Sequence, residues 1–97
     1  MFLNNHILVT GLVSLVVEHR WKEKNAQDAF KVVGSIIDMQ KNGKLPSGFT
    51  LKSVNVVENE RMAVCEWDAP SVDDFKGLLE KVNPPTKHEV YLSKRLL

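Results

Sequence analysis

The sequence contains a single cysteine, Cys65, among its 97 residues. One thiol excludes an intrachain disulfide and any zinc or iron-sulfur site that needs several cysteines of this chain. Disulfides are common in small secreted domains and rare in the reducing cytoplasm. We therefore expect a cytoplasmic protein in which Cys65 is a small core residue.

The chain also lacks an excess of charge of either sign. Thirteen Lys and Arg residues stand against twelve Asp and Glu residues, which leaves a formal net charge of +1. A protein without a strong positive field does not attract nucleic acid or anionic lipid over a distance. We therefore expect neither nucleic acid nor a membrane as a partner.

Charge is missing altogether from the first seventeen residues, MFLNNHILVTGLVSLVV. No Lys or Arg precedes the apolar run and no small-residue cleavage site follows it, so the segment does not match a secretory signal. Polar residues and Gly11 interrupt it, whereas a membrane-spanning helix needs about 20 apolar residues. Because the pattern of strands and helices is complete from Ser14 onward, we predict an N-terminal extension over residues 1–13 and one domain over residues 14–97.

Short motifs of well-known enzyme classes are absent as well. The sequence has no GxGxxG, GxxxxGK[ST], HExxH or GxSxG pattern. Dinucleotide-binding, P-loop, zinc-protease and nucleophile-elbow chemistry therefore have no support from sequence motifs. The sequence therefore leaves the cofactor unknown.

What the sequence does contain is a regular succession of short strands and amphipathic helices. Strands rich in apolar and β-branched residues are predicted over residues 14–21, 50–57, 61–67 and 88–96. Apolar residues recur at helical spacing over residues 25–42 and 72–82, which predicts two helices. Asn25 and Ser71 are the expected N-caps, and Asn42-Gly43 and Asn83-Pro84-Pro85 are the expected stops.

The order strand, helix, strand, strand, helix, strand is typical of the α+β class and of its ferredoxin-like βαββαβ fold. This fold has a four-stranded antiparallel sheet with both helices on one face. The other face would carry Val16, Met62 and Val64, and a small protein seldom leaves such a face open to water. We therefore predict a homodimer in which two sheets face each other, which is a dimeric α+β barrel.

Four stretches carry a resemblance to a known group of proteins. They are EHRWK in the first strand, KLPSGF after the first helix, CEWDAPS before the second helix and VNPPTKHEVY near the end. Together they resemble small uncharacterised dimeric α+β-barrel proteins, over residues 14–92. The resemblance implies ferredoxin-like protomers that pack sheet to sheet and can enclose a cleft. Relatives of that architecture include small monooxygenases, haem-handling proteins and metal-binding proteins, so the resemblance implies a fold and a dimer but no activity.

The candidate ligand-binding residues are charged or titratable side chains on the predicted strands. Glu18 and Arg20 share one strand face, and Glu66 is expected beside them on the open face of the sheet. Two carboxylates near an arginine can bind a ligand, transfer protons or form a structural ion pair. His19 and His88 complete the predicted set, which is Glu18, His19, Arg20, Glu66 and His88.

A metal site would have to recruit His19 and His88 together with Cys65 or Glu66, which are residue types that bind zinc or nickel. No closely spaced ligand motif joins them in the sequence. We therefore predict no metal site.

Three functions fit these observations. The leading hypothesis is a small homodimeric protein that binds a small molecule in a cleft between the two sheets. The alternative is an enzyme, such as a cofactor-independent oxygenase or isomerase, that uses Glu18, His19 and Glu66 as acid-base groups. A third is a purely structural or interaction module, in which dimer packing covers the whole open face.

Overall fold

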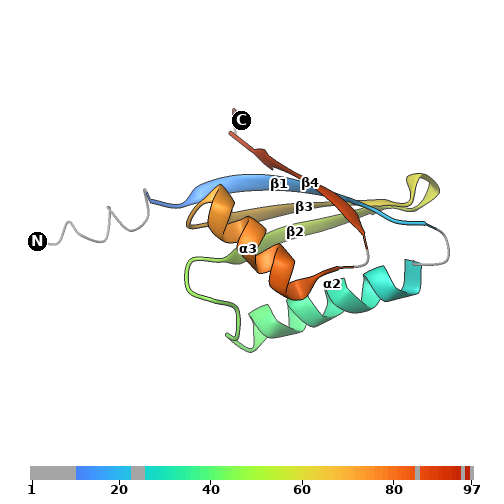
Figure 1. Ribbon diagram of the computed structural model, residues 1–97, viewed down its shortest axis with the longest axis horizontal. Helices are drawn as coiled ribbons and strands as arrows, with labels where there is room; N and C mark the ends of the chain where they lie inside the picture. The colour runs from blue at the N-terminus through green and yellow to red at the C-terminus, as the bar shows by residue number, and fades with distance from the viewer. Residues whose placement is uncertain (1–10, 23–25, 85, 95, 97) are drawn as a thin grey trace, which may run out of the picture.

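The computed structural model describes residues 11–22, 26–84, 86–94 and 96. Its elements, in chain order, are strand β1 (Val13–Arg20), helix α2 (Ala26–Lys41), strand β2 (Thr50–Val57), the 3-10 helix η2 (Glu58–Glu60), strand β3 (Met62–Ala69), helix α3 (Val72–Val82) and strand β4 (Lys87–Leu92). The strands form one sheet in the order β2-β3-β1-β4, and every neighbouring pair is antiparallel. This arrangement confirms the ferredoxin-like fold (Figure 1).

Element boundaries differ from the predicted ones in two strands. β3 extends to Ala69, which pairs with Val13. β4 ends at Leu92, where its ladder with β1 reaches Leu15, and not at Leu96. Asn25 and most of the predicted N-terminal extension lie outside the described residues. Within the described part of the chain, no helix is long and apolar enough to cross a membrane.

The core lies between the sheet and the helices. β3 alternates strictly, with its buried side chains on the helix face. Phe75 and Leu79 of α3 pack onto this layer, and the Phe75 ring meets the Trp67 indole edge to face at 5.2 Å between centroids. The buried residues of this cluster are Leu15, Val17, Leu51, Cys65, Trp67, Ala69, Phe75 and Leu79.

The N-terminal end of α3 and the C-terminal end of α2 are capped as predicted. The Ser71 hydroxyl accepts a hydrogen bond from the Asp74 backbone N–H at 3.0 Å, which makes Ser71 the N-cap of α3. Gly43, at φ 67°, follows α2, and the Lys44 N–H bonds back to the Met39 carbonyl at 2.7 Å. This is a Schellman ending, which needs the left-handed conformation that glycine adopts easily.

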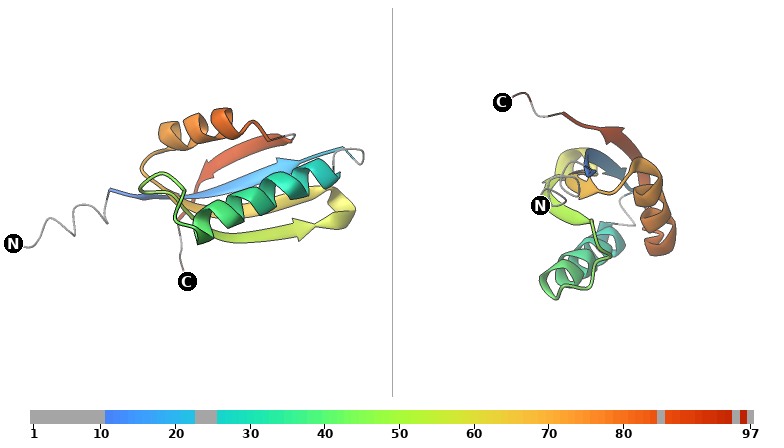
Figure 2. Two further views of the ribbon diagram at one scale, coloured as in Figure 1. Left: turned by 90° about the horizontal axis from the view of Figure 1, so that it is seen from below. Right: turned by 90° about the vertical axis from the view of Figure 1, so that its left-hand side faces the viewer.

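Helix α2 is anchored at its C-terminal end but shallowly packed elsewhere. The Gln40 side-chain amide donates to the Leu51 carbonyl at 2.8 Å and its oxygen accepts from the Leu51 N–H, which fixes α2 beside a β-bulge in β2. Along the rest of α2, Ala29 alone is buried. Figure 2 shows α2 and α3 standing apart over the same face of the sheet. An apolar strip of sheet therefore lies between the two helices.

Candidate functional site

The structure divides the predicted ligand-binding residues between the two faces of the sheet. Glu18 and Arg20 alternate with His19 along β1, so they point to opposite faces. Glu66 lies opposite Val16 and shares the open face with Glu18 and Arg20, whereas His88 lies opposite His19 on the helix face. The five residues therefore do not converge on one site. Glu18, His19 and Glu66 in particular cannot act together on one substrate within a single protomer.

On the open face, the predicted charged residues are engaged with neighbours. Glu66 accepts a hydrogen bond from the Ser53 hydroxyl at 2.7 Å, and Glu18 lies 3.9 Å from Arg20. Glu18 and Glu66 are diagonal neighbours on adjacent strands, because Glu18 pairs with Val64 and Glu66 pairs with Val16. This geometry is that of a partly exposed polar network, and ion pairs of this kind contribute little to stability.

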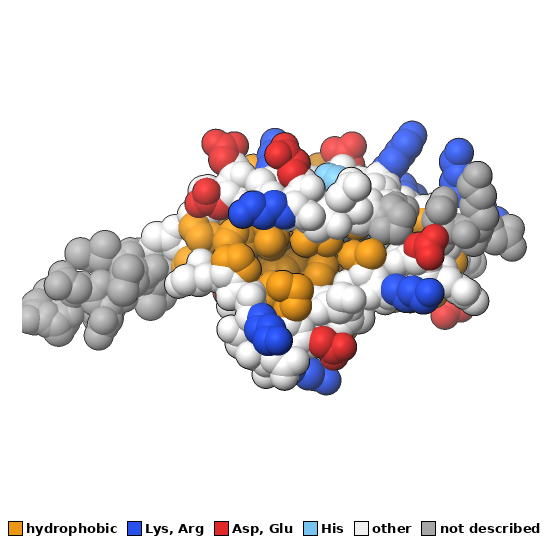
Figure 3. Space-filling model, turned by 60° about the horizontal axis from the view of Figure 1, so that its bottom comes forward, with side chains coloured by type: hydrophobic (Ala, Val, Ile, Leu, Met, Phe, Trp, Pro, Cys, Tyr) orange, Lys and Arg blue, Asp and Glu red, His pale blue; other side chains and the backbone are white. Residues whose placement is uncertain are grey.

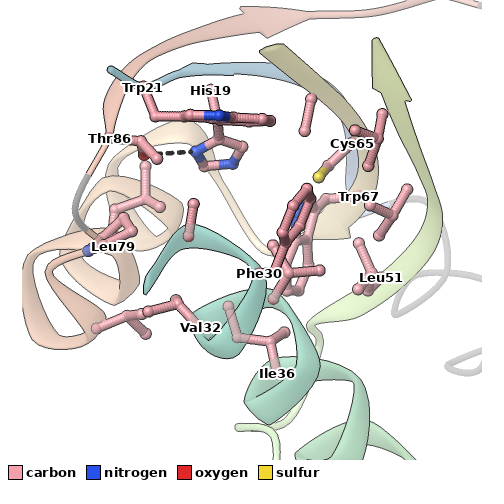
Figure 4. A pocket seen from close by; sticks show the side chains of 17 residues that line it. His19, Trp21, Phe30, Val32, Ile36, Leu51, Cys65, Trp67, Leu79 and Thr86 are labelled. Carbon is pink, nitrogen blue, oxygen red and sulfur yellow. Dashed lines mark hydrogen bonds between the residues drawn. The ribbon is translucent and has the colours of Figure 1, made fainter. Parts of the chain in front are cut away.

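The helix face holds a cavity that the sequence did not predict. It lies between the sheet and the diverging helices, with a floor from β2 and β3 and walls from α2 and α3 (Figure 4). The lining residues are His19, Trp21, Ala29, Phe30, Val32, Val33, Ile36, Leu51, Val54, Val56, Ala63, Cys65, Trp67, Leu79, Val82, Pro84 and Thr86. Figure 3 shows an apolar strip on this side of the molecule with charged side chains along its rim.

Two volumes describe the size of the cavity. About 50 Å³ is available to the centre of a water-sized sphere. One water molecule needs roughly 10 to 15 Å³ by that measure, so the inner space holds a few waters or about one six-membered ring. All space between the atoms of the pocket, including space that is open to solvent, is about 640 Å³. We base ligand size on the first value.

Aromatic side chains shape this cavity. Trp21, just after β1, meets Phe30 of α2 edge to face, with 5.7 Å between ring centroids. Trp67 of β3 forms part of the floor, where Phe75 supports it from α3. Phe30 remains 44% exposed. Both tryptophans of the chain therefore line the same cavity.

His19 and Thr86 form the polar end of the cavity. The His19 Nδ1 atom lies 3.2 Å from the Thr86 hydroxyl, and its second ring nitrogen points into the cavity (Figure 4). Burial, aided by the nearby His88, lowers the pKa of His19 from 6.5 to about 4. The two imidazole centroids are 6.1 Å apart. His19 is therefore a neutral imidazole at neutral pH, able to donate from one nitrogen and accept at the other.

Cys65 lies on the floor of the cavity and is 4% exposed, as expected for a core cysteine. Burial raises the pKa of its thiol to about 11, because an apolar environment disfavours the thiolate. The thiolate is the nucleophilic form of cysteine. At neutral pH Cys65 therefore contributes apolar surface and not a reactive group.

No cluster of three His, Cys, Asp or Glu side chains suited to a metal ion occurs in the part of the chain that the structure describes. His19 and His88 are close, but Glu66 lies on the other face of the sheet.

Three of the residues that matter most here, Trp21, Phe30 and Thr86, were not singled out from the sequence. The available signal was the large aromatic side chain of Phe30 on a helix whose other apolar residues are small or aliphatic.

The buried neutral state of His19 predicts a pH dependence of stability. Its pKa is 6.5 ordinarily and about 4 in the folded protein, so between these values the unfolded chain binds a proton that the folded chain does not. The free energy of unfolding should be constant above about pH 6.5 and fall as the pH drops toward 4, by on the order of 2 kcal/mol for this half-buried ring. Urea unfolding of the wild type and of His19→Phe across this range measures the difference.

In that experiment, His19→Phe should lose this slope, and His88→Phe should keep most of it because burial is the main cause of the shift. Carboxylates titrate at the acidic end in all three proteins, so only the difference between proteins reports on His19. Identical slopes for the wild type and His19→Phe would contradict the prediction.

Comparison with known proteins supports the fold. No protein-family model and no curated protein matches the sequence. A solved structure, described as a conserved protein from Methanosarcina mazei Go1, aligns with 92% of this chain and 99% of its own length. The alignment has a TM-score of 0.56 and 12% sequence identity. At this identity the likeness shows a shared small α+β fold and nothing about activity.

Proposed function

We propose that this protein binds a small molecule and that its binding site is the cavity between the sheet and helices α2 and α3. The observation that carries the proposal is an apolar, aromatic-walled cavity with the His19–Thr86 pair at one end. Ligand sites are typically apolar concavities with a few placed polar groups. The cavity is complete within one chain, whereas a cleft between two sheets would require a second copy.

Binding fits the geometry better than catalysis does. The acid-base alternative needs Glu18, His19 and Glu66 around one substrate, and they lie on two faces of the sheet. In the cavity, His19 is neutral and no carboxylate of the described residues is hydrogen-bonded to it, and Cys65 is protonated. A nucleophile and base within reach of each other are the usual sign of covalent catalysis, and the lining residues do not supply that pair.

A second copy of the chain is the partner that we propose for the open face. Val16, Met62 and Val64 on this face are partly exposed. Tyr91 extends the apolar surface onto β4 and is 49% exposed. Packing two such faces together removes apolar surface from water on both chains at once.

The charges on the open face also favour a two-fold pair. Glu66 lies toward the end of the sheet where β1 begins, beside Asp68, which forms a 3.6 Å ion pair with Lys52. Arg20 and Lys87 lie at the end where β1 finishes. A two-fold axis across the strands places the acidic end of one sheet over the basic end of the other. Such self-complementary charge favours one register of a symmetric interface. A cleft between the sheets remains a prediction of this dimer.

Titration of 15N-labelled protein with 4-methylphenol tests the proposed cavity site. Because Trp21 and Trp67 both line the cavity, their two indole N–H signals should shift saturably, with a Kd on the order of 0.1 to 1 mM for a ligand of this size. Ala63→Leu would fill the floor of the cavity and should weaken binding at least tenfold.

Val64→Leu is the matched control for that titration. It adds a methylene to the neighbouring residue of β3, on the opposite face of the sheet. It should leave the indole shifts unchanged. An absence of saturable shifts in the wild type, or equal binding by Ala63→Leu, would overturn the proposed site.

A further inference from the structure

We infer that the cavity selects uncharged, flat ligands that carry a hydroxyl group, and that His19 positions this hydroxyl. The inference rests on the proposed binding site and adds the chemical class of its ligand. Three features of the lining carry it: the absence of charge, the aromatic walls and the unpaired nitrogen of His19.

The lining excludes ionised ligands. Among the described residues that line the cavity, none is an Asp, Glu, Lys or Arg. A carboxylate or ammonium group entering this space would lose its hydration without gaining an opposite charge, which costs several kcal/mol. Among the described lining residues, His19 is the one that could carry a positive charge, and it is neutral at neutral pH.

The walls favour a flat ring. Trp67 forms part of the floor, and Trp21 and Phe30 meet edge to face in the lining. Aromatic pairs gain from offset or edge-to-face contact beyond the area that they bury. The space of about 50 Å³ that is available to the centre of a water-sized sphere corresponds to about one six-membered ring.

The His19 imidazole offers one remaining hydrogen-bonding position. Its Nδ1 atom faces Thr86, and Nε2 has no hydrogen-bond partner among the described residues. If Nδ1 accepts from the threonine hydroxyl, Nε2 carries the proton and donates; if Nδ1 donates to Thr86, Nε2 accepts. A ligand hydroxyl can both donate and accept, so it satisfies either tautomer. A phenol or a similar planar alcohol is therefore the best match to this site.

Three ligands with the same ring separate these contributions: 4-methylphenol, toluene and 4-methylbenzoate. Each is titrated into the 15N-labelled wild-type protein near pH 7.5, and the Trp21 and Trp67 indole signals are followed. We expect 4-methylphenol to bind 3- to 10-fold more tightly than toluene, which is the contribution of one neutral hydrogen bond. We expect 4-methylbenzoate to bind at least tenfold more weakly than toluene.

Two ring-for-ring substitutions assign the effect to His19. His19→Phe keeps a ring at the polar end but removes both nitrogens, so it should bind 4-methylphenol and toluene equally, with toluene affinity little changed. His88→Phe removes the imidazole that lies across the ladder but outside the cavity lining, and should keep the wild-type preference. Thr86→Val keeps His19 while removing its partner, and should reduce the preference for 4-methylphenol if His19→Phe does not fold.

The outcomes distinguish the two proposals. If none of the three ligands shifts the indole signals, the cavity is not a binding site and the proposed function falls with the inference. If the signals respond but toluene binds as tightly as 4-methylphenol, or 4-methylbenzoate binds most tightly, the proposed site stands and the inferred ligand class is wrong. A preference for 4-methylphenol that survives in His19→Phe would also overturn the role of His19.

Discussion

Val64→Lys is expected to dissociate the proposed homodimer or unfold the chain. Val64 lies on β3 near the centre of the open face, between Glu18 of β1 and Asn55 of β2. A two-fold interface presents the same surface twice, so one substitution introduces two ammonium groups. Burying an unpaired charge costs several kcal/mol, and small proteins are stable by only about 5 to 15 kcal/mol.

Light scattering and circular dichroism at a fixed micromolar concentration measure this outcome. The wild type should have twice the 11.0 kDa mass of one chain, and Val64→Lys should have the mass of a monomer or lose its folded spectrum. Asn55→Lys is the comparison, because Asn55 lies opposite Val64 on the same face but on the edge strand, where it is exposed, and it should weaken the dimer less than Val64→Lys does. A monomeric wild type, or a Val64→Lys dimer of undiminished stability, would rule out the sheet-to-sheet dimer.

Phe75→Ala is expected to produce a much larger loss of stability than Phe30→Ala. Phe75 is 1% exposed and holds α3 against Trp67. Removing a buried phenyl ring typically costs about 3 to 5 kcal/mol, since the lost contacts leave a void. The edge-to-face contact with Trp67 adds to this loss. Urea unfolding at constant protein concentration measures the change.

Phe30→Ala provides the matched comparison. Phe30 also meets a tryptophan edge to face, but it is 44% exposed. Its removal should cost about 1 to 2 kcal/mol, less than Phe75→Ala, because nearly half of the Phe30 side chain already faces water. It should nevertheless weaken 4-methylphenol binding severalfold by removing a wall of the cavity. If Phe30→Ala destabilised the protein as much as Phe75→Ala, the groove would have to be closed in solution and the proposed site would fail.

Local patterns were sufficient to predict the secondary structure and its order. Strict alternation in the strand that contains Cys65 and Trp67 placed both residues in the core, where the structure finds them. The N-cap at Ser71 and the helix stop at Asn42-Gly43 were also read from single residues, because capping depends on chemistry within one helical turn. These features depend on neighbours in sequence, and tertiary contacts did not override them.

The candidate site shows where such patterns stop being informative. The alternation of side chains along the first strand predicted that His19 points away from Glu18. Both were nevertheless included in one predicted ligand-binding set, because each side chain can bind a ligand or transfer a proton. The register of β1 against β3 and β4 separates them. His88 was identified as a candidate but lies outside the lining of the cavity, whereas Thr86, two residues earlier, bonds to His19.

The amino-acid sequence by itself determined the order of the elements, the faces of the strands, the core positions and the lack of a strong net charge. Each of these follows from side-chain periodicity or composition, which are properties of neighbouring residues. Only the tertiary structure decided that α2 diverges from α3 and that Trp21, Phe30, Trp67 and Thr86 meet around one space. Helix separation depends on how side chains from distant segments fill the volume above the sheet, and no local pattern specifies that volume.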